Sequence, residues 1–358
     1  MSYNYAFYIH HHGSGHLMRS VAIARNLPKG TVSFLGSGLA RYKEVVPDYI
    51  QCIELPGDMI SEVDKIAFTA DVDFLHYVPI NLKSAAERTA KITVSLNGLF
   101  PVLLIVDVSV EIALLAALTS IPTVVIRQNG DRNDLAHLNA YQSARMLLAP
   151  CTRDLMNPSA NEWVDKKTYF SGGFSRYTGI CSNAGEVNPI PGSIGVMTGM
   201  GGTSLGLPFV RRLAEACKSS KIHVIGSLAG HEELDLPDNV HILGSVQDPL
   251  EQLRTYEVII GNAGHNTVME MADLNKYFIC IPETRPFNEQ FAKAKLLQDN
   301  KMAIVVHPHQ IMEADWEELV SQAKRLPSDR WNGVINQQAP EKICEELVIL
   351  GNQLFGNT

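Results

Sequence analysis

Residues 258–272 read Val258-Ile-Ile-Gly-Asn-Ala-Gly-His-Asn-Thr-Val-Met-Glu-Met-Ala272. The apolar residues at the start predict a buried strand, the segment Gly261 to Gly264 predicts a tight turn, and a helix is expected to begin near His265. The first N–H groups of a helix have no partner within it, so this turn aims several donors at one point where the helix dipole favours an anion. The stretch therefore predicts a phosphate site in an α/β fold.

Polar side chains follow this turn at two places. Glu270 lies one turn further along the predicted helix, where its carboxylate can accept hydrogen bonds from the vicinal hydroxyls of a ribose. A second apolar strand at 277–281 ends in a polar loop that contains Glu289 and Gln290. Ligands of open α/β sheets bind beyond the carboxyl ends of the strands, so both places are expected at one rim. A glycine turn between strand and helix also occurs without any ligand, and the turn alone leaves both interpretations open.

The full order of residues is more specific than the turn. Gly264-x-Asn266-Thr267-x-x-Glu270, then Ile281-Pro282, then Glu289-Gln290 resembles the donor-binding signature of nucleotide-sugar glycosyltransferases with two Rossmann-like domains facing across a cleft, the GT-B fold. It is similar to UDP-glycosyltransferases of secondary metabolism and to the N-acetylglucosamine transferase family of peptidoglycan synthesis. The resemblance implies a diphosphate held by Gly264, His265, Asn266 and Thr267, a ribose held by Glu270, and sugar hydroxyls held by Glu289 and Gln290.

The same construction recurs near the amino end. A strand over residues 4–10 leads into a turn that contains Gly13 and Gly15 and ends at His16, and a helix follows. This turn places the imidazole of His16 at the carboxyl edge of the sheet, where it can take a proton from an attacking acceptor at neutral pH. In the families that this chain resembles, a Gly-His at this place supplies the catalytic base. The alternative is a surface histidine at the start of a helix.

Asp107 ends the apolar strand at 102–107, and a helix begins soon after it. Its carboxylate could accept from the other imidazole N–H of His16 and stabilise the imidazolium that forms. The resemblance implies this role, because Asp107 matches the acidic partner of the plant-type enzymes. An N-cap aspartate at the start of the next helix is an equal alternative.

Two further segments complete the predicted donor site. Gly199-Met-Gly-Gly-Thr-Ser204 is a second glycine-rich loop before a helix, and a generic turn is its alternative interpretation. The resemblance implies that Gly201, Gly202 and Thr203 face the diphosphate across the cleft. It also implies that backbone groups near Val246 hold the nucleobase.

We expect no metal and no cofactor besides the nucleotide sugar, for which a UDP-sugar is favoured by the resemblance. Asp71-Val-Asp73 could chelate a divalent ion, but it has no third ligand nearby in the sequence. His10, His11 and His12 follow one another at a strand end, and adjacent side chains of a strand point to opposite sides. Helix N-termini, rather than a metal ion, are therefore expected to supply the positive charge that holds the diphosphate.

A chain of 358 residues with 46% hydrophobic residues suits two α/β domains. We predict an acceptor-binding Rossmann-like domain at 1–178, a linker at 179–192, a donor-binding Rossmann-like domain at 193–335 and a C-terminal helix at 336–358. In the resembled families this helix crosses back onto the first domain.

Charge and cysteine content limit the partners and the compartment. The net charge of −8 gives no basic field for nucleic acid. Six scattered cysteines without a C-x-x-C pair favour reduced thiols, and the absence of an apolar leader favours the cytoplasm. A lipid-linked acceptor would add peripheral contact with a membrane.

The sequence thus predicts a metal-independent, inverting glycosyltransferase that moves a sugar from a nucleotide sugar to an acceptor hydroxyl on a small molecule, a glycan or a lipid. Two alternatives stay open. One is a nucleotide-sugar hydrolase or epimerase of the same fold, because the turns that begin at Gly13 and Gly199 also resemble a sugar-nucleotide hydrolase of nonulosonate synthesis. The other is a non-catalytic nucleotide-sugar-binding subunit.

Overall fold

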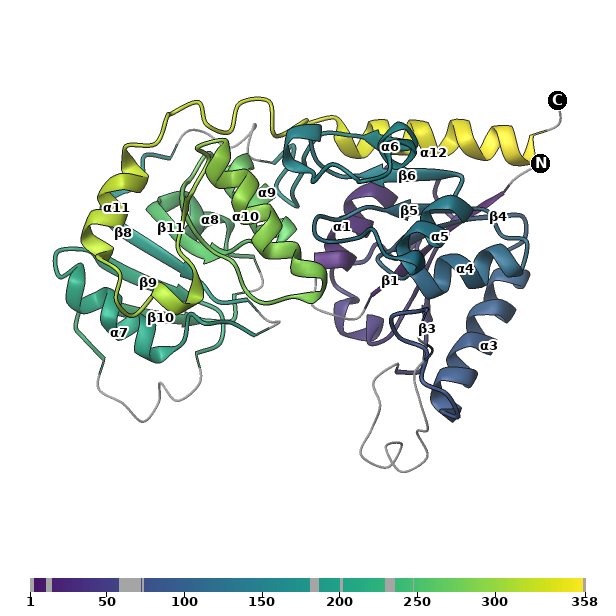
Figure 1. The fold of residues 1–358 in the computed structure, drawn as a ribbon, viewed down its shortest axis with the longest axis horizontal. Coiled ribbons are helices and arrows are strands. Elements are labelled where there is room, and N and C mark those ends of the chain that lie inside the picture. The colour runs from purple at the N-terminus through teal and green to yellow at the C-terminus, as the bar shows by residue number, and fades with distance from the viewer. Residues whose placement is uncertain are drawn as a thin grey trace.

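Two parallel β-sheets, each flanked by helices, organise the chain (Figure 1). The computed structural model describes residues 3–10, 15–57, 72, 74–180, 187–199, 202–228, 236–246 and 248–356. The strand order is β3-β2-β1-β4-β5-β6-β7 in the first sheet and β10-β9-β8-β11-β12-β13 in the second. Each order changes direction beside the first strand of its sheet, as in Rossmann-like domains. The predicted α/β fold with two Rossmann-like units is confirmed.

The strands of the first sheet are β1 Asn4–Ile9, β2 Val32–Gly36, β3 Gln51–Glu54, β4 Val102–Asp107, β5 Thr123–Ile126, β6 Met146–Ala149 and β7 Thr168–Phe170. Those of the second sheet are β8 Ile190–Met197, β9 Lys221–Ile225, β10 Val240–Gly244, β11 Tyr256–Asn262, β12 Tyr277–Ile281 and β13 Ile304–Val305. All pairings between these described strands are parallel, so the carboxyl ends of the strands in each sheet lie along one edge.

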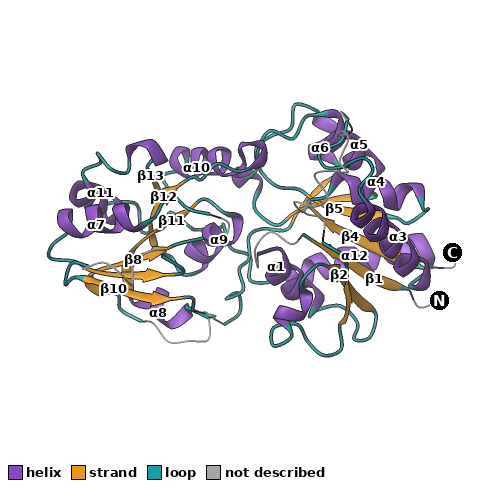
Figure 2. Ribbon diagram, turned by 90° about the horizontal axis from the view of Figure 1, so that it is seen from below, coloured by secondary structure: helices purple, strands orange, loops and turns teal. Residues whose placement is uncertain are grey.

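Helices lie on both sides of each sheet (Figure 2). The α-helices of the first half are α1 Gly15–Ala24, α3 Lys83–Gly98, α4 Val110–Leu118, α5 Leu135–Ser143 and α6 Glu162–Lys166. Those that follow are α7 Leu207–Ala216, α8 Leu250–Thr255, α9 His265–Asp273, α10 Glu289–Asp299, α11 Trp316–Lys324 and α12 Ala339–Phe355. Short 3-10 helices are η1 Leu39–Tyr42, η2 Arg153–Leu155, η4 Pro286–Asn288 and η5 Pro308–Gln310.

The central strands are buried on both faces, which explains their continuous apolar sequences. In β4, Leu103 and Ile105 join the core on one side of the sheet, whereas Leu104 and Val106 join the core on the other side. In β11 the same alternation separates Ile259 from its neighbours. Each sheet thus holds two apolar layers, and polar groups are left at the ends of the strands.

Helix α12 packs on the first sheet, although its sequence follows the second (Figure 1). Ile343 and Leu347 are fully buried in the core that also contains Leu17 of α1. The thiol of Cys344 lies 3.1 Å from the carbonyl oxygen of Ile23. The last helix therefore ties the carboxyl end of the chain to the first half.

The second sheet begins inside the range 179–192 that the sequence predicts as a linker. Strand β8 begins at Ile190, because Ile190 pairs with Tyr256 of β11 although a proline and a glycine follow it. Residues 181–186 of the predicted linker lie outside the described residues. Within the part of the chain that the structure describes, no helix has the length and apolar character needed to cross a bilayer.

Truncation of Leu347 tests the anchoring of α12. We expect Leu347→Ala to lower the free energy of unfolding by about 2–5 kcal/mol, because it leaves a cavity under the helix. Ile349 is 50% exposed on the same helix, and Ile349→Ala should change stability by less than about 0.5 kcal/mol. Urea denaturation of the two variants measures this difference, and equal effects would contradict the packing.

Candidate functional site

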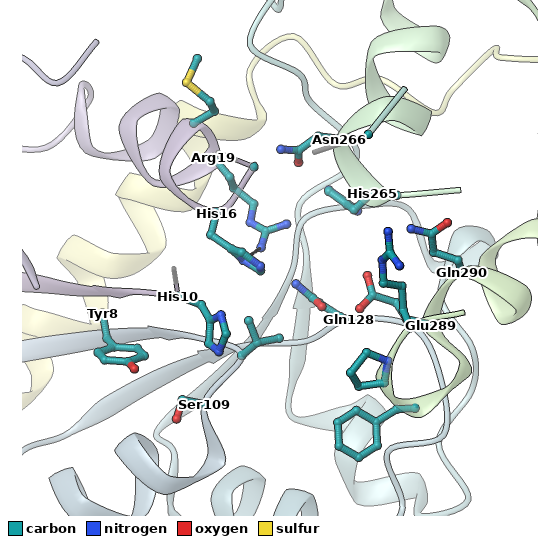
Figure 3. A pocket seen from close by; sticks show the side chains of 18 of the residues that line it. Tyr8, His10, His16, Arg19, Ser109, Gln128, His265, Asn266, Glu289 and Gln290 are labelled. Carbon is teal, nitrogen blue, oxygen red and sulfur yellow. Dashed lines mark hydrogen bonds between the residues drawn. The ribbon is translucent and has the colours of Figure 1, made fainter. Parts of the chain in front are cut away.

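A cavity of about 1130 Å³ lies where the carboxyl edges of the two sheets face each other. Its walls come from both halves of the chain, with His16, Arg19 and Gln128 on one side and His265 and Glu289 on the other (Figure 3). The lining includes His10, which follows β1, and Met197, which ends β8. The strand order changes direction beside β1 in the first sheet and beside β8 in the second. Ligands of open α/β sheets bind at such points.

The start of helix α9 forms one wall. Strand β11 ends at Asn262, and its side-chain oxygen accepts from the Gly264 N–H at 2.9 Å and from the Thr267 hydroxyl at 3.4 Å. No side chain caps the helix at Gly264. The backbone N–H groups of His265, Asn266 and Thr267 have no acceptor among the described residues. The predicted anion site therefore has its donors in place.

Burial lowers the pKa of His265 well below its usual value, and the charge of Arg19 lowers it further. The ring is therefore neutral at physiological pH. The group that His265 offers to an anion is therefore its backbone N–H rather than an imidazolium charge.

The starts of α1 and α9 approach each other across the cavity. A methyl group added to Gly15 at the start of α1 would lie 2.6 Å from the side-chain nitrogen of Asn266 at the start of α9. The two helix starts thus lie on opposite sides of one narrow gap. Gly13 lies outside the described residues.

His16 and Asp107 meet at the end of β4. The imidazole Nδ1 lies 3.0 Å from Asp107 Oδ2, and Asp107 is 1% exposed. Because a carboxylate only accepts hydrogen bonds, Nδ1 carries the hydrogen and Nε2 keeps a lone pair for a proton. Asp107 is not the N-cap of α4, because Ser109 occupies that position and accepts from the Ile112 N–H.

Arg19 is the third member of this group, and the sequence analysis did not single it out. Its Nη2 donates to both carboxylate oxygens of Asp107 at 2.7 Å and lies 3.3 Å from His16 Nδ1. Burial raises the pKa of Asp107, but the charges of Arg19 and His16 outweigh burial and hold that pKa below its usual value. The carboxylate is therefore ionised at neutral pH and can stabilise a positive imidazolium.

Glu270 lies on α9 in the cavity wall, as predicted, but an arginine pairs with it. Arg176 Nε lies 2.9 Å from Glu270 Oε1. Burial raises the pKa of Glu270 to about 7, and the charge of Arg176 opposes this rise. A ribose that binds here has to share the carboxylate with Arg176 or displace it.

Glu289 and Gln290 both line the cavity, and they differ in their contacts. Glu289 Oε2 accepts from Arg132 Nη2 at 3.3 Å, which links the second half of the chain to the first. The Gln290 side-chain oxygen accepts from the backbone N–H groups of Ala263 and Glu283 at 3.2 and 2.9 Å. Gln290 therefore joins the turn after β11 to the loop after β12.

Most described residues of the second glycine-rich loop, 199–204, do not line the cavity, and the hydrogen-bond donors of Thr203 and Ser204 point to another group. The hydroxyls of Thr203 and Ser204 and the Ser204 N–H all donate to one carboxylate oxygen of Glu283. The donors predicted to face a diphosphate are thus used by a carboxylate. Among the described residues, the cavity lining includes Gly199 but not Gly202, Thr203 or Val246. Gly201, Asp71, Asp73, His11 and His12 lie outside the described residues.

A second histidine group lies at the rim of the first half. His76 Nε2 and His137 Nδ1 lie 2.9 and 2.5 Å from the two carboxylate oxygens of Asp134. Their spacing would suit a metal ion. However, Arg132 donates to His137 Nε2 at 2.9 Å, so the ring hydrogen is on Nδ1, where a metal would need a lone pair. The group is therefore better described as a hydrogen-bond chain.

The side chain of Phe287 from the second half packs on this group. Its ring centroid lies 4.7 Å from the centroids of His76 and His137 and 4.9 Å from the Arg132 guanidinium. A side chain on Gly130 would collide with the carbonyl oxygen of Phe287, which also accepts from the Asp131 N–H at 2.7 Å. The loop that carries Glu289 is thus held against the first half.

Residues 216–340 match the family model described as the glycosyltransferase family 28 C-terminal domain. No curated protein matches the chain. Solved structures with a similar fold include CalG4, the calicheamicin glycosyltransferase, at 14% identity over 99% of this chain and 100% of that chain, with a TM-score of 0.67. MurG of Acinetobacter baumannii is similar at 15% identity over 97% and 99%, with a TM-score of 0.59.

The spinosyn rhamnosyltransferase SpnG is similar at 16% identity over 98% of this chain and 100% of that chain, with a TM-score of 0.61. SpnG structures contain thymidine diphosphate in one case and the spinosyn aglycone in another. At these identities the likeness establishes the fold. Together with the family match, it confirms the resemblance that the sequence predicts.

Removal of the Asp107 charge tests how much the buried contacts among Asp107, Arg19 and His16 stabilise the fold. We expect Asp107→Asn to destabilise the protein by about 3–5 kcal/mol at pH 7, because Arg19 is left buried without its carboxylate. Because the pKa of Asp107 is lowered in the folded state, the advantage of the wild type is complete above about pH 4 and declines as the pH falls below it.

Chemical denaturation between pH 3 and 8 measures this advantage. Glu318→Gln removes one partner of an exposed ion pair with Arg325 and serves as the control, with an expected loss much smaller than that of Asp107→Asn. An Asp107→Asn protein as stable as this control would contradict the account.

Proposed function

We propose that this chain, a glycosyltransferase with the GT-B fold, moves a sugar from a nucleotide-sugar donor to an acceptor hydroxyl in the cavity between its two halves. One observation carries the proposal. The uncapped start of α9 and the imidazole of His16 line the same cavity, and the buried Asp107 contacts His16 Nδ1 from behind the wall. An anion site opposite a general base is what displacement of a diphosphate by a hydroxyl requires.

The donor half supplies the contacts to the nucleotide. The N–H groups of residues 265–267 donate hydrogen bonds to the diphosphate, and Glu270 accepts hydrogen bonds from the ribose. Glu289 and Gln290 lie at the same rim for the hydroxyls of the sugar. We propose a UDP-sugar as the donor, on the likeness of the motif to UDP-glycosyltransferases. The thymidine diphosphate bound to SpnG makes the thymidine nucleotide the alternative to test.

The reaction is a single displacement. His16 Nε2 takes the proton from the acceptor hydroxyl while the acceptor oxygen attacks the anomeric carbon. The bond from that carbon to the diphosphate oxygen breaks, and the leaving diphosphate takes the electron pair. Attack on the face opposite to the leaving group inverts the anomeric configuration. The N–H groups at the start of α9 stabilise the charge on the leaving group without a metal.

The acceptor half lines the rest of the cavity with both apolar and polar side chains. The apolar part includes Tyr8, Met18, Tyr77, Val78 and Ile112, and the polar part includes Arg88, Thr89 and Glu111. Such a mixed wall suits an acceptor with a hydrophobic body that also carries polar groups, one of them a hydroxyl directed toward His16. We propose an acceptor of this kind, and an aglycone bound to SpnG is consistent with it.

Replacement of His16 tests the base. We expect His16→Ala to lower kcat for sugar transfer by about 10²–10⁴ without a large change in the donor KM, because the base acts only as the acceptor attacks. His241 is exposed on β10, away from the cavity lining, and His241→Ala should retain full activity. Transfer from UDP-glucose to a panel of hydrophobic alcohols and phenols measures the effect.

The same assay without an acceptor separates transfer from hydrolysis. Release of glucose as fast without an acceptor as with one would identify a hydrolase instead. Transfer that is unchanged in His16→Ala would remove His16 from the mechanism.

The pH dependence of donor binding tests Glu270. Its pKa of about 7 means that the carboxyl is protonated below that pH and ionised above it, and the ionised form is the better acceptor for ribose hydroxyls. We expect the affinity for UDP-glucose to rise as the pH increases through 7. Glu270→Gln should weaken binding by roughly 10- to 100-fold and abolish this rise.

Calorimetric titration at pH 6 and pH 8 with UDP-glucose measures both effects. Its diphosphate has no group that titrates in this range, so a pH effect reports on the protein. Glu257 is a carboxylate outside the cavity, and Glu257→Gln serves as the control. A Glu270→Gln protein with wild-type affinity at both values would contradict the ribose contact.

A further inference from the structure

Gln128 lies between the two halves of the site, two residues after the end of β5 (Figure 3). One end of its side-chain amide is 2.8 Å from Glu289 Oε2, and the other is 3.2 Å from Arg19 Nη2. A carboxylate only accepts hydrogen bonds and a guanidinium only donates them. The amide therefore satisfies these two neighbours when its nitrogen donates to Glu289 and its oxygen accepts from Arg19. Arg132 Nη2 lies 3.4 Å from the end of the amide that faces Glu289, and in this orientation it keeps Glu289 Oε2 as its acceptor.

This arrangement makes a continuous chain of hydrogen bonds across the cavity. Glu289, from the second half, accepts from Gln128. Gln128 accepts from Arg19, Arg19 donates to Asp107, and Asp107 lies 3.0 Å from His16 Nδ1. The chain therefore joins the carboxylate predicted to hold the donor sugar to the histidine predicted to take the acceptor proton.

Arg19 Nη2 is the point where the chain can transmit a change. This nitrogen has two hydrogens, but three oxygens lie within hydrogen-bond distance of it: both carboxylate oxygens of Asp107 and the amide oxygen of Gln128. A hydrogen given to Gln128 is taken from Asp107. When Arg19 donates fewer hydrogen bonds to Asp107, the carboxylate keeps more of its negative charge. Because that charge stabilises the imidazolium, His16 then holds its proton more strongly.

We infer that Gln128 is a positioning residue that couples Glu289 to the His16–Asp107 pair through Arg19. The inference rests on the proposed function for the roles of Glu289 and His16 in sugar transfer. The contacts themselves are independent of it. Gln128 sets how Arg19 divides its hydrogen bonds, and a donor sugar that engages Glu289 acts on the base through this division.

Four other titratable or charged groups among the described residues face His16, and a test of Gln128 has to leave their identities unchanged. Arg19 lies on its own helix, Asp107 is at the end of β4, and the His10 ring centroid at the end of β1 is 5.8 Å away. The neutral His265 faces it from the start of α9. A substitution at Gln128 leaves all four groups in place.

Two substitutions at Gln128 are expected to move the titration of His16 in opposite directions. Gln128→Met keeps the length of the side chain but gives Arg19 no acceptor. Both Nη2 hydrogens then go to Asp107, and the midpoint of the His16 titration falls by about half a pH unit. Gln128→Glu puts a carboxylate beside both Arg19 and Glu289. Repulsion from Glu289 favours contact of the new carboxylate with Arg19, and its negative charge raises that midpoint by about the same amount.

NMR of the histidine rings in the full-length protein, without any nucleotide, measures the midpoint. The His16 signal is assigned as the one missing from His16→Ala. Gln142→Met is the matched control, because Gln142 is exposed on α5 outside the cavity, and its midpoint should equal that of the wild type. Thermal unfolding of each variant checks that the fold is retained.

Opposite shifts in the two Gln128 variants support the coupling. Midpoints within about 0.2 pH unit of the wild type in both variants overturn it. Shifts in the same direction also overturn it, because they report a loosened site rather than a redistribution of hydrogen bonds.

Kinetics with UDP-glucose supply the second readout. Gln128→Met should lower kcat about tenfold, less than the loss of a general base, and should change the donor KM less than threefold because Arg132 still holds Glu289. A raised donor KM with an unchanged kcat overturns the coupling. A wild-type protein that neither binds nor transfers from any nucleotide sugar refutes the proposed function, whereas the NMR titration still decides the coupling.

Discussion

The contact between the starts of α1 and α9 is the constraint on which the rest of the site depends. Gly15 lies directly against the side chain of Asn266, so the gap between the two helix starts is narrow. Each helix follows an inner strand of a parallel sheet, so its start lies at the edge where polar groups collect. Because these two edges face each other, the proposed anion site of one sheet and His16 of the other line one cavity.

Arginines pair with three carboxylates in or directly behind the walls of that cavity. Arg19 contacts Asp107, Arg176 contacts Glu270, and Arg132 contacts Glu289. The first two carboxylates are buried, and without a partner each would bear the full cost of leaving water. The pairs keep charge available at the positions where the proposed sugar nucleotide needs acceptors. Binding of this donor would exchange one set of contacts for another instead of exposing an unpaired charge.

The sequence predicted the fold and the two turns because both leave strong local patterns. Apolar strands that end in glycine turns specify the sheet edges, and the carboxyl end of β4 brings Asp107 to His16. The arginines left no such pattern, since Arg19 is one residue in an ordinary amphipathic helix. Gln128 and the contact of Thr203 with Glu283 depend on the packing of distant loops, which no spacing in the sequence encodes.

A structure of the complex with UDP tests the central claim most directly. The account predicts the diphosphate within hydrogen-bond distance of the backbone nitrogens of residues 265–267, with the ribose hydroxyls on Glu270 and the cavity toward His16 open for a sugar. A nucleotide bound outside the gap between Gly15 and Asn266, or one whose diphosphate contacts neither helix start, would contradict it.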